Sequence, residues 1–238
     1  MTKILFINPS KWGRGITPIW IASHTAMLRS KDHKVELFDA TFYKNWSIDE
    51  LSFNTANEQY KPSLYSQYIE LNGANILYDL QKNVDAYKPD IIFWSAISSH
   101  IHGEGEYVNI QYGYELIDQL TTNSLIITGG LQVTARPKEM YKLFPKVNYF
   151  IGGESELVLC EIADAFPNID EITKINGIAY LDKDEVILNP KQQIIDDLDI
   201  IPPYDYSVFE DQVFYRPYNG SVERAVDYEL SRGCIYAC

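Results

Sequence analysis

Two cysteines close to the end of the sequence have a spacing that suits metal ligands. Cys234 and Cys238 are separated by three residues, and Cys234 directly follows Ser231, Arg232 and Gly233. Thiolates are soft ligands for iron–sulfur clusters, and a glycine beside the first cysteine permits a tight loop. Two cysteines four positions apart can also be buried core residues or half of a zinc site. The pair alone therefore leaves three alternatives open.

Small polar residues and glycines follow several short apolar segments. Three such groups occur, namely Asn8, Pro9 and Ser10, then Ser95, Ile97 and Ser98, then Gly129 and Gly130. Small hydroxyls and glycines let a large ligand approach the backbone and offer hydrogen bonds without filling space. Taken singly, Ser95 is an ordinary strand-end serine and the glycine pair is an ordinary tight turn. A binding role depends on whether the fold brings the groups together.

Alternating elements along the first 165 residues would position these groups. Short apolar runs predict five strands, at 3–8, 34–38, 90–95, 124–128 and 147–151. Segments of helical character lie between and after them, at 17–29, 75–87, 110–121, 137–143 and 154–165. In the first helix, Thr17 is the predicted N-cap and Pro18 suits the first turn.

This alternation predicts an α/β fold. The runs show little polar alternation, as expected for strands covered on both faces. We expect a flavodoxin-like or Rossmann-like doubly wound parallel sheet with strand order 2-1-3-4-5. In such a sheet the ligand crevice lies beyond the carboxyl ends of the strands, between strands one and three. The three groups of small residues are expected to lie around that crevice.

The pattern changes after residue 170. Two short apolar runs, 176–181 and 185–188, predict a β-hairpin. Residues 189–205 are polar and contain a Pro-Pro pair, which indicates a connector. We expect three parts, which are a first domain at 1–170 with an insertion at 41–74, a hairpin and linker at 171–205, and a further segment at 206–238.

Three ligand-binding domains that use this fold match poorly at the strand ends. A phosphoryl-receiver domain needs a carboxylate after the third strand and a lysine after the fifth, where this sequence has Ser95 and Gly152. A flavodoxin needs a hydroxyl-rich phosphate loop after the first strand, and residues 8–15 match it poorly. The Gly-x-Gly-x-x-Gly of a dinucleotide-binding domain is absent from the same place.

A fourth occupant of the fold, cobalamin, fits better. Residues 8–9, 17–22 and 34–40 resemble the opening of the cobalamin-binding domain of radical S-adenosylmethionine enzymes. Ser95-x-Ile97 resembles the Ser-x-Leu element of that family, Thr128-Gly129-Gly130 with Thr134 and Pro137 its Gly-Gly element, and residues 153–156 (Gly-Glu-Ser-Glu) its Gly-Glu-Gly-Glu turn. The resemblance implies that these loops bind cobalamin, through Asn8, Pro9, Ser10, Ser95, Ile97, Ser98, Gly129, Gly130, Thr134, Gly153 and Glu154.

One departure concerns the cobalt ligand. Many cobalamin domains carry Asp-x-His-x-x-Gly after the first strand, whereas the corresponding loop here has no histidine. Most radical members of the family lack it too, so we expect cobalt without a histidine ligand from this loop. His100 and His102 are the nearby candidates for a substitute, and solvated loop residues are the simpler interpretation.

The terminal cysteines gain meaning beside this resemblance. Residues 229–238 resemble the start of the Cys-x3-Cys-x2-Cys motif, in which three thiolates hold a 4Fe-4S cluster and one iron stays open for S-adenosylmethionine. The resemblance implies that Cys234 and Cys238 are cluster ligands, with the third cysteine falling three residues past Cys238. Residues 198–205 resemble the family's link between its two halves, so 206–238 is expected to be the truncated start of the radical domain.

Composition limits the class of protein. The 238 residues carry a net charge of −13, with no cluster of basic residues, which argues against nucleic acid as a partner. No apolar run approaches the length that spans a bilayer. Three cysteines in a chain of this length suggest no disulfide framework and point to a reducing cytoplasm, and Cys160 is expected to be a buried structural thiol.

We therefore expect a cobalamin-binding front part of a cobalamin-dependent radical enzyme, of the methyltransferase type that is commonest in the family. The cluster and S-adenosylmethionine would bind only in a full-length form, because this sequence lacks the third cysteine and the catalytic barrel. Two alternatives stay open, a free-standing cobalamin carrier or sensor, and a degenerate interaction domain without cofactor. Protein partners are not predicted.

Overall fold

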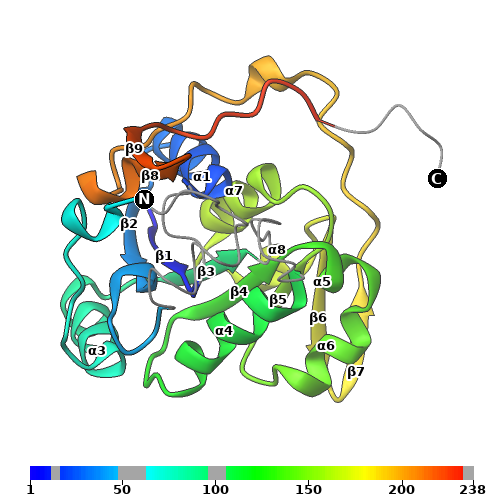
Figure 1. Ribbon diagram of the computed structural model, residues 1–238. Helices are drawn as coiled ribbons and strands as arrows, with labels where there is room; N and C mark the ends of the chain where they lie inside the picture. Colours follow the sequence, from blue (N-terminus) through cyan, green and yellow to red (C-terminus); the bar gives the residue numbers. More distant parts are fainter. Residues whose placement is uncertain (12–16, 48–62, 96–105, 233–238) are drawn as a thin grey trace.

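The computed structural model describes residues 1–11, 17–47, 63–95 and 106–232 (Figure 1). Its central strands are parallel and lie in the order β2-β1-β3-β4-β5. Their bounds are Lys3–Asn8 for β1, Lys34–Asp39 for β2, Ile91–Ser95 for β3, Leu125–Gly129 for β4 and Tyr149–Ile151 for β5. The predicted α/β fold and strand order are confirmed.

A hairpin extends this sheet. Strand β6 (Ile178–Asp182) pairs antiparallel with β5, and β7 (Glu185–Leu188) pairs antiparallel with β6, which gives seven strands in one mixed sheet. Lys183 and Asp184 both have positive φ, 45° and 68°, as a two-residue turn of type I′ requires. The hairpin was expected from the sequence, whereas its addition to the main sheet was not.

Helices cover both faces of the sheet (Figure 1). Helices α1 (Ile19–Ser30), α7 (Glu156–Ala165) and α8 (Ile169–Ile172) pack on one face. The other face is covered by α3 (Ile76–Tyr87), α4 (Glu106–Asp118), α5 (Leu131–Ala135) and α6 (Pro137–Leu143). The chain changes face between α1 and α3, so the strand order reverses between β1 and β3, as the doubly wound arrangement requires.

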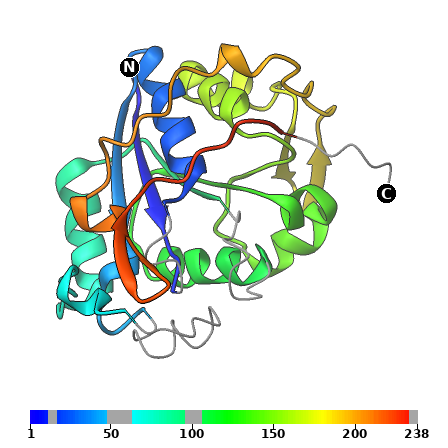
Figure 2. The same ribbon diagram turned by 45° about the horizontal axis from the view of Figure 1, so that its top comes forward.

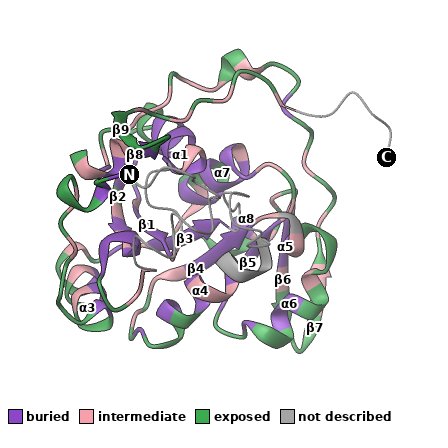
Figure 3. Ribbon diagram, viewed as in Figure 1, coloured by how far each residue is buried: buried purple, intermediate pink, exposed green. Residues whose placement is uncertain are grey.

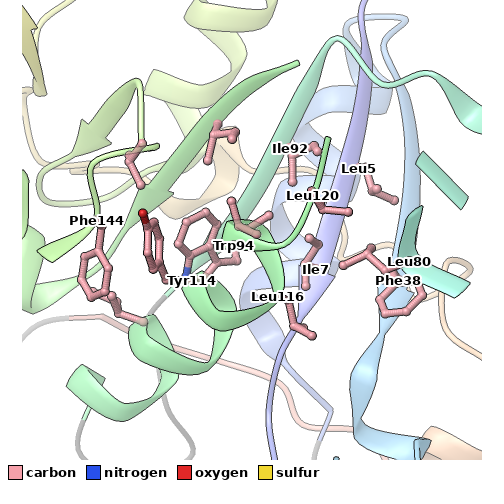
Figure 4. Packing of buried hydrophobic residues seen from close by; sticks show 14 of the residues in the cluster. Leu5, Ile7, Phe38, Leu80, Ile92, Trp94, Tyr114, Leu116, Leu120 and Phe144 are labelled. Carbon is pink, nitrogen blue, oxygen red and sulfur yellow. The ribbon is translucent and has the colours of Figure 1, made fainter. Parts of the chain in front are cut away.

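Strand β1 shows why its sequence lacks polar alternation. Ile4 and Phe6 pack against α1 and α7, while Leu5 and Ile7 pack on the opposite face, and all four are fully buried. Figure 3 shows the central strands as buried along their length, and Figure 4 shows Leu5 and Ile7 in the cluster that α3 and α4 cover. Two-sided burial is expected for parallel strands in an α/β sheet.

The start of α1 differs from the prediction. Pro18, rather than Thr17, is the N-cap, with φ −65° and an extended ψ of 104°, and no side chain caps the helix. The Thr17 backbone N–H instead donates to Asp227 Oδ2 at 2.8 Å. This contact joins residues 210 positions apart, which local sequence rules do not anticipate.

Residues beyond β7 return across the molecule. They form the short helices η4 (Leu198–Ile200) and η5 (Asp211–Phe214), then the hairpin of β8 (Tyr215–Tyr218) and β9 (Ser221–Arg224). Phe209 and Val213 are buried in the cluster that contains α1. Figure 2 shows the segment that follows β9, in dark red, crossing over α1. The limits of the three expected parts stay a prediction.

The expected insertion at 41–74 is short of regular structure where it is described. It begins with η1 (Ala40–Phe42) and contains η2 (Tyr65–Gln67), and Tyr43 and Asn72 form an isolated bridge. Residues 48–62 lie outside the described residues. No helix in the described part of the chain is long and apolar enough to cross a bilayer.

Helix α4 packs on Trp94 without space for a side chain at Gly113. A Cβ at Gly113 would lie 2.4 Å from two atoms of the Trp94 indole. We predict that Gly113→Ala lowers the free energy of unfolding by about 1–3 kcal/mol, although alanine favours helices. Urea unfolding of the variant and of the unmodified chain measures this difference in the free energy of unfolding. Gly73→Ala is the control, because no atom lies within 4 Å there. Equal stability of the two variants would contradict the packing.

His24 gives a pH-dependent stability. It is 1% exposed, and burial lowers its pKa, an effect that Glu156 opposes. The unfolded chain takes up a proton below about pH 6.5 while the buried ring does not, so stability falls as pH decreases through that value, by up to about 1.4 kcal/mol per pH unit. Urea unfolding at pH 7.5 to 5 should show this slope. His24→Gln should flatten it, and an unchanged slope would refute the assignment to His24.

Candidate cofactor site

The predicted site residues that the structure describes lie at the carboxyl edge of the sheet. Ser95, Gly129 and Ile151 are register neighbours at the ends of β3, β4 and β5. Asn8 and Ser95 each lie two residues past the paired Phe6 and Phe93. The fold thus brings the described members of the three groups to one edge, as expected. Ile97, Ser98, His100, His102, Cys234 and Cys238 lie outside the described residues.

The loop after β1 is fixed to the end of β2. The Asn8 side-chain amide donates to Asp39 Oδ1 and to Thr41 Oγ1, both at 3.1 Å. Burial raises the pKa of Asp39, and the hydrogen bonds from Thr41 and Asn8 oppose that rise. The Trp46 indole N–H donates to the carbonyl of Pro9 at 2.9 Å. Asn8 and Pro9 therefore lie in a loop whose backbone position is set by neighbouring side chains.

Lys11 closes this loop against α4. Its ammonium lies 4.1 Å from the ring centre of Trp46 and 4.2 Å from that of Tyr112. It also lies 3.4 Å from the carboxylate of Glu115. Cation–π contacts of this kind contribute about 0.5–1 kcal/mol at exposed positions. Sequence reasoning missed this set, because Trp46 and Tyr112 come from distant segments.

Thr134 joins the loops that follow β4 and β5. Its hydroxyl donates to the carbonyl of Gly130 at 2.8 Å and accepts from the Gly153 backbone N–H at 2.9 Å. Gly130 and Gly153 have φ of 124° and 79°, which favours glycine at both positions. A Cβ built on Gly153 would meet no atom within 4 Å. The turn thus presents open backbone beside a fixed hydroxyl, which suits the approach of a large ligand.

Gly129 has a more ordinary role. A Cβ there would lie 3.4 Å from the carbonyl oxygen of Ile151 and 3.7 Å from Ser155 Cβ. Its small size therefore serves the close packing of β4 beside β5 and α7. Glu154 is also engaged within the protein, because its carboxylate accepts from the Ile195 backbone N–H at 2.7 Å and lies 3.4 Å from an Arg232 nitrogen.

A cavity of about 540 Å³ opens beside the Thr134 turn. Its lining joins the glycine loop, the hairpin strands and the chain after β7, and includes Thr134, Gly153, Glu154, Ile178, Lys191 and Gln192. A volume of this size suits a small ligand or one arm of a larger one. Cobalamin carries amide arms and a phosphodiester, so amides, backbone groups and a lysine are suitable partners for it.

A second cavity, of about 520 Å³, lies between β2 and α3. Four carboxylates line it, those of Asp39, Glu70, Asp79 and Glu210. Such a lining repels a phosphate, so this cavity fits the cofactor less well.

No group of three or more metal-ligating side chains occurs among the described residues. Cys160 is fully buried, as expected, and burial raises its pKa to about 12.

Comparison with known proteins finds distant relatives of the chain. No protein-family model matches the chain. Over 163 residues it is 25% identical to the anaerobic magnesium-protoporphyrin IX monomethyl ester cyclase of Cereibacter sphaeroides, a match that covers 67% of this chain and 25% of the cyclase. Over 126 residues it is 27% identical to the cobalamin-dependent radical SAM methyltransferase TokK of Streptomyces tokunonensis, covering 52% of this chain and 18% of TokK.

A solved structure supports the fold. The radical S-adenosylmethionine methyltransferase TsrM from Kitasatospora setae, with cobalamin and a 4Fe-4S cluster bound, superposes with a TM-score of 0.53 and 17% identity over 87% of this chain and 32% of TsrM. The chain thus spans about a quarter to a third of the cyclase and of TsrM. It is a distant homologue of the cobalamin-dependent radical S-adenosylmethionine enzymes and resembles their cobalamin-binding region.

Proposed function

We propose that this chain binds cobalamin at the carboxyl edge of its sheet, as the cobalamin-binding part of a radical S-adenosylmethionine enzyme. The observation that carries the proposal is the Thr134 turn, in which one hydroxyl fixes Gly130 and Gly153 beside the larger cavity. Homology to cobalamin-dependent enzymes over the same fold supports it.

The residues at this edge have a defined task in the proposal. Gly130 and Gly153 let the cofactor approach the backbone, and Thr134 keeps the two loops at a fixed separation. Lys191 and Gln192 offer a cation and an amide to the arms of the cofactor in the cavity. Cobalamin, when bound, would supply the chemistry of carbon-group transfer, and the loop after β1, whose sequence has no histidine, would offer it no imidazole.

The further chemistry belongs to a longer protein in this proposal. Cys234 and Cys238 would be two of the three thiolate ligands of a 4Fe-4S cluster that binds S-adenosylmethionine. A methyl transfer to a substrate radical is the reaction class that fits a cobalamin partner. The cysteine pair lies in the same chain as the proposed cobalamin site, and in this proposal the two cofactors serve one active site.

The direct test is corrinoid binding by the 238-residue chain. After mixing with hydroxocobalamin and gel filtration, we expect corrinoid absorbance to co-elute with folded protein at about one equivalent, as for one site. The band positions report whether a protein histidine ligates cobalt, and we expect none. A folded chain that elutes free of corrinoid would overturn the proposal and favour an interaction domain without cofactor.

Thr134 provides a sharper test of where the corrinoid binds. Thr134→Val removes both hydroxyl hydrogen bonds and keeps the side-chain shape, so the two glycine loops lose their link. We predict that the Kd for hydroxocobalamin rises about tenfold, the equivalent of roughly 1.4 kcal/mol.

The matched control is Thr173→Val, because the Thr173 hydroxyl also donates to a backbone carbonyl but lies at the C-cap of α8. Its Kd should equal that of the unmodified chain. Equal affinity of all three proteins would place the corrinoid away from the Thr134 turn.

A further inference from the structure

Arg232 is bound by three carboxylates at once. Its Nε lies 2.7 Å from Glu229, one terminal nitrogen lies 2.6 Å from Glu156, and the other lies 3.4 Å from Glu154. The Arg232 side chain is 18% exposed. Each nitrogen of the planar guanidinium thus faces a different acidic side chain, an arrangement that a lysine ammonium on its flexible stem does not reproduce.

Glu156 is the buried member of this set. It is the first residue of α7, its side chain is 6% exposed, and it also accepts from the Ser23 hydroxyl at 3.3 Å. Burial opposes its charge, but the hydrogen bond and the positive charge of Arg232 help to hold the pKa of Glu156 below its ordinary value. A buried carboxylate of this kind depends on its cation, and loss of either partner leaves an uncompensated charge.

The buried surroundings hold Glu156 in place. The neighbouring Ser155 hydroxyl lies 2.8 Å from His24 Nε2, and His24 Nδ1 lies 2.6 Å from the carbonyl of Trp20. Because a carbonyl only accepts, the proton of the neutral ring is on Nδ1, and Nε2 accepts from Ser155. These hydrogen bonds fix the start of α7 to α1 without any contribution from Arg232.

The segment that leads to Arg232 is also fixed along its length. Asp227 accepts from the Thr17 backbone N–H and pairs with Arg216. The Tyr206 hydroxyl donates to the Asp227 carbonyl at 2.6 Å, and the Tyr204 hydroxyl donates to Glu229 at 3.2 Å. Figure 1 shows this segment, in red, passing over α1 toward the side of α7.

We propose that Glu154, Glu156 and Glu229 form a clamp that fixes Arg232 at the loop after β5, and so fixes the point from which the chain continues to Cys234. Cys234 follows Arg232 by two residues, a chain length of at most about 7 Å. The loop of residues 153–156 then has two tasks, since Gly153 borders the proposed cofactor site while Glu154 and Glu156 hold the arginine that precedes the first cysteine. This inference rests on the proposed function for its chemical purpose.

Trypsin tests the clamp in the 238-residue chain, because cleavage after residue 232 requires the Arg232 side chain to leave its carboxylates. The rate of release of the peptide 233–238 is measured by mass spectrometry. We expect Glu156→Gln to raise this rate roughly tenfold or more, because the open state becomes more populated. Glu156→Asp, which keeps the charge, should restore much of the protection. Glu161→Gln, an exposed change on the same helix, is the control and should leave the rate unchanged.

Arg232→Lys is a second variant that keeps a trypsin site and leaves the buried residues of the domain unaltered. We expect this variant also to be cleaved faster, while its melting temperature stays close to that of the unmodified chain. Faster cleavage at an unchanged melting temperature then reports loss of the Arg232 contacts and not loss of overall stability. Equal release rates in the unmodified chain, Glu156→Gln and Arg232→Lys would overturn the clamp, whatever the corrinoid result. Protection that depends on Glu156 in a chain that binds no corrinoid would support the clamp and overturn the proposed function.

Discussion

Burial of the parallel sheet on both faces is the constraint on which the rest of the structure depends. Alternate residues of β1 enter two separate cores, Ile4 and Phe6 in one, Leu5 and Ile7 in the other. Neither face can then accept a polar ligand. The carboxyl edge is where the strands end in small and polar residues, so binding chemistry at the sheet concentrates there.

At that edge, side chains hold the loops at defined separations. Thr134 joins the turns after β4 and β5, Asn8 joins β1 to the end of β2, and Trp46 with Tyr112 encloses Lys11. These contacts leave glycine backbone open while fixing its position, which limits the ordering cost of binding a large cofactor. The turn at 153–156 combines two such roles, because its glycine faces open space and its glutamates hold Arg232.

The sequence predicted the elements well wherever local periodicity determined them. Apolar runs marked β1 to β5 and the hairpin, since two-sided burial selects uninterrupted apolar residues. Contacts between distant segments were not predictable. The Thr17 backbone N–H binds Asp227, the hairpin joins the main sheet, and Arg232 contacts Glu156 across 76 positions. At the site, Gly130, Thr134 and Gly153 lie at one edge, as the resemblance implied, whereas no local pattern pointed to Lys11 or His24.

Hydrogen exchange with and without hydroxocobalamin tests the central claim most directly, because it locates the cofactor on the intact chain. Binding at the carboxyl edge predicts slower exchange in peptides covering 8–10, 129–134 and 152–154. Exchange should stay unchanged at the opposite edge, in residues 31–33 and 88–90, which precede β2 and β3. Slower exchange confined to the acidic cavity between β2 and α3, or no change in any peptide, would contradict the account.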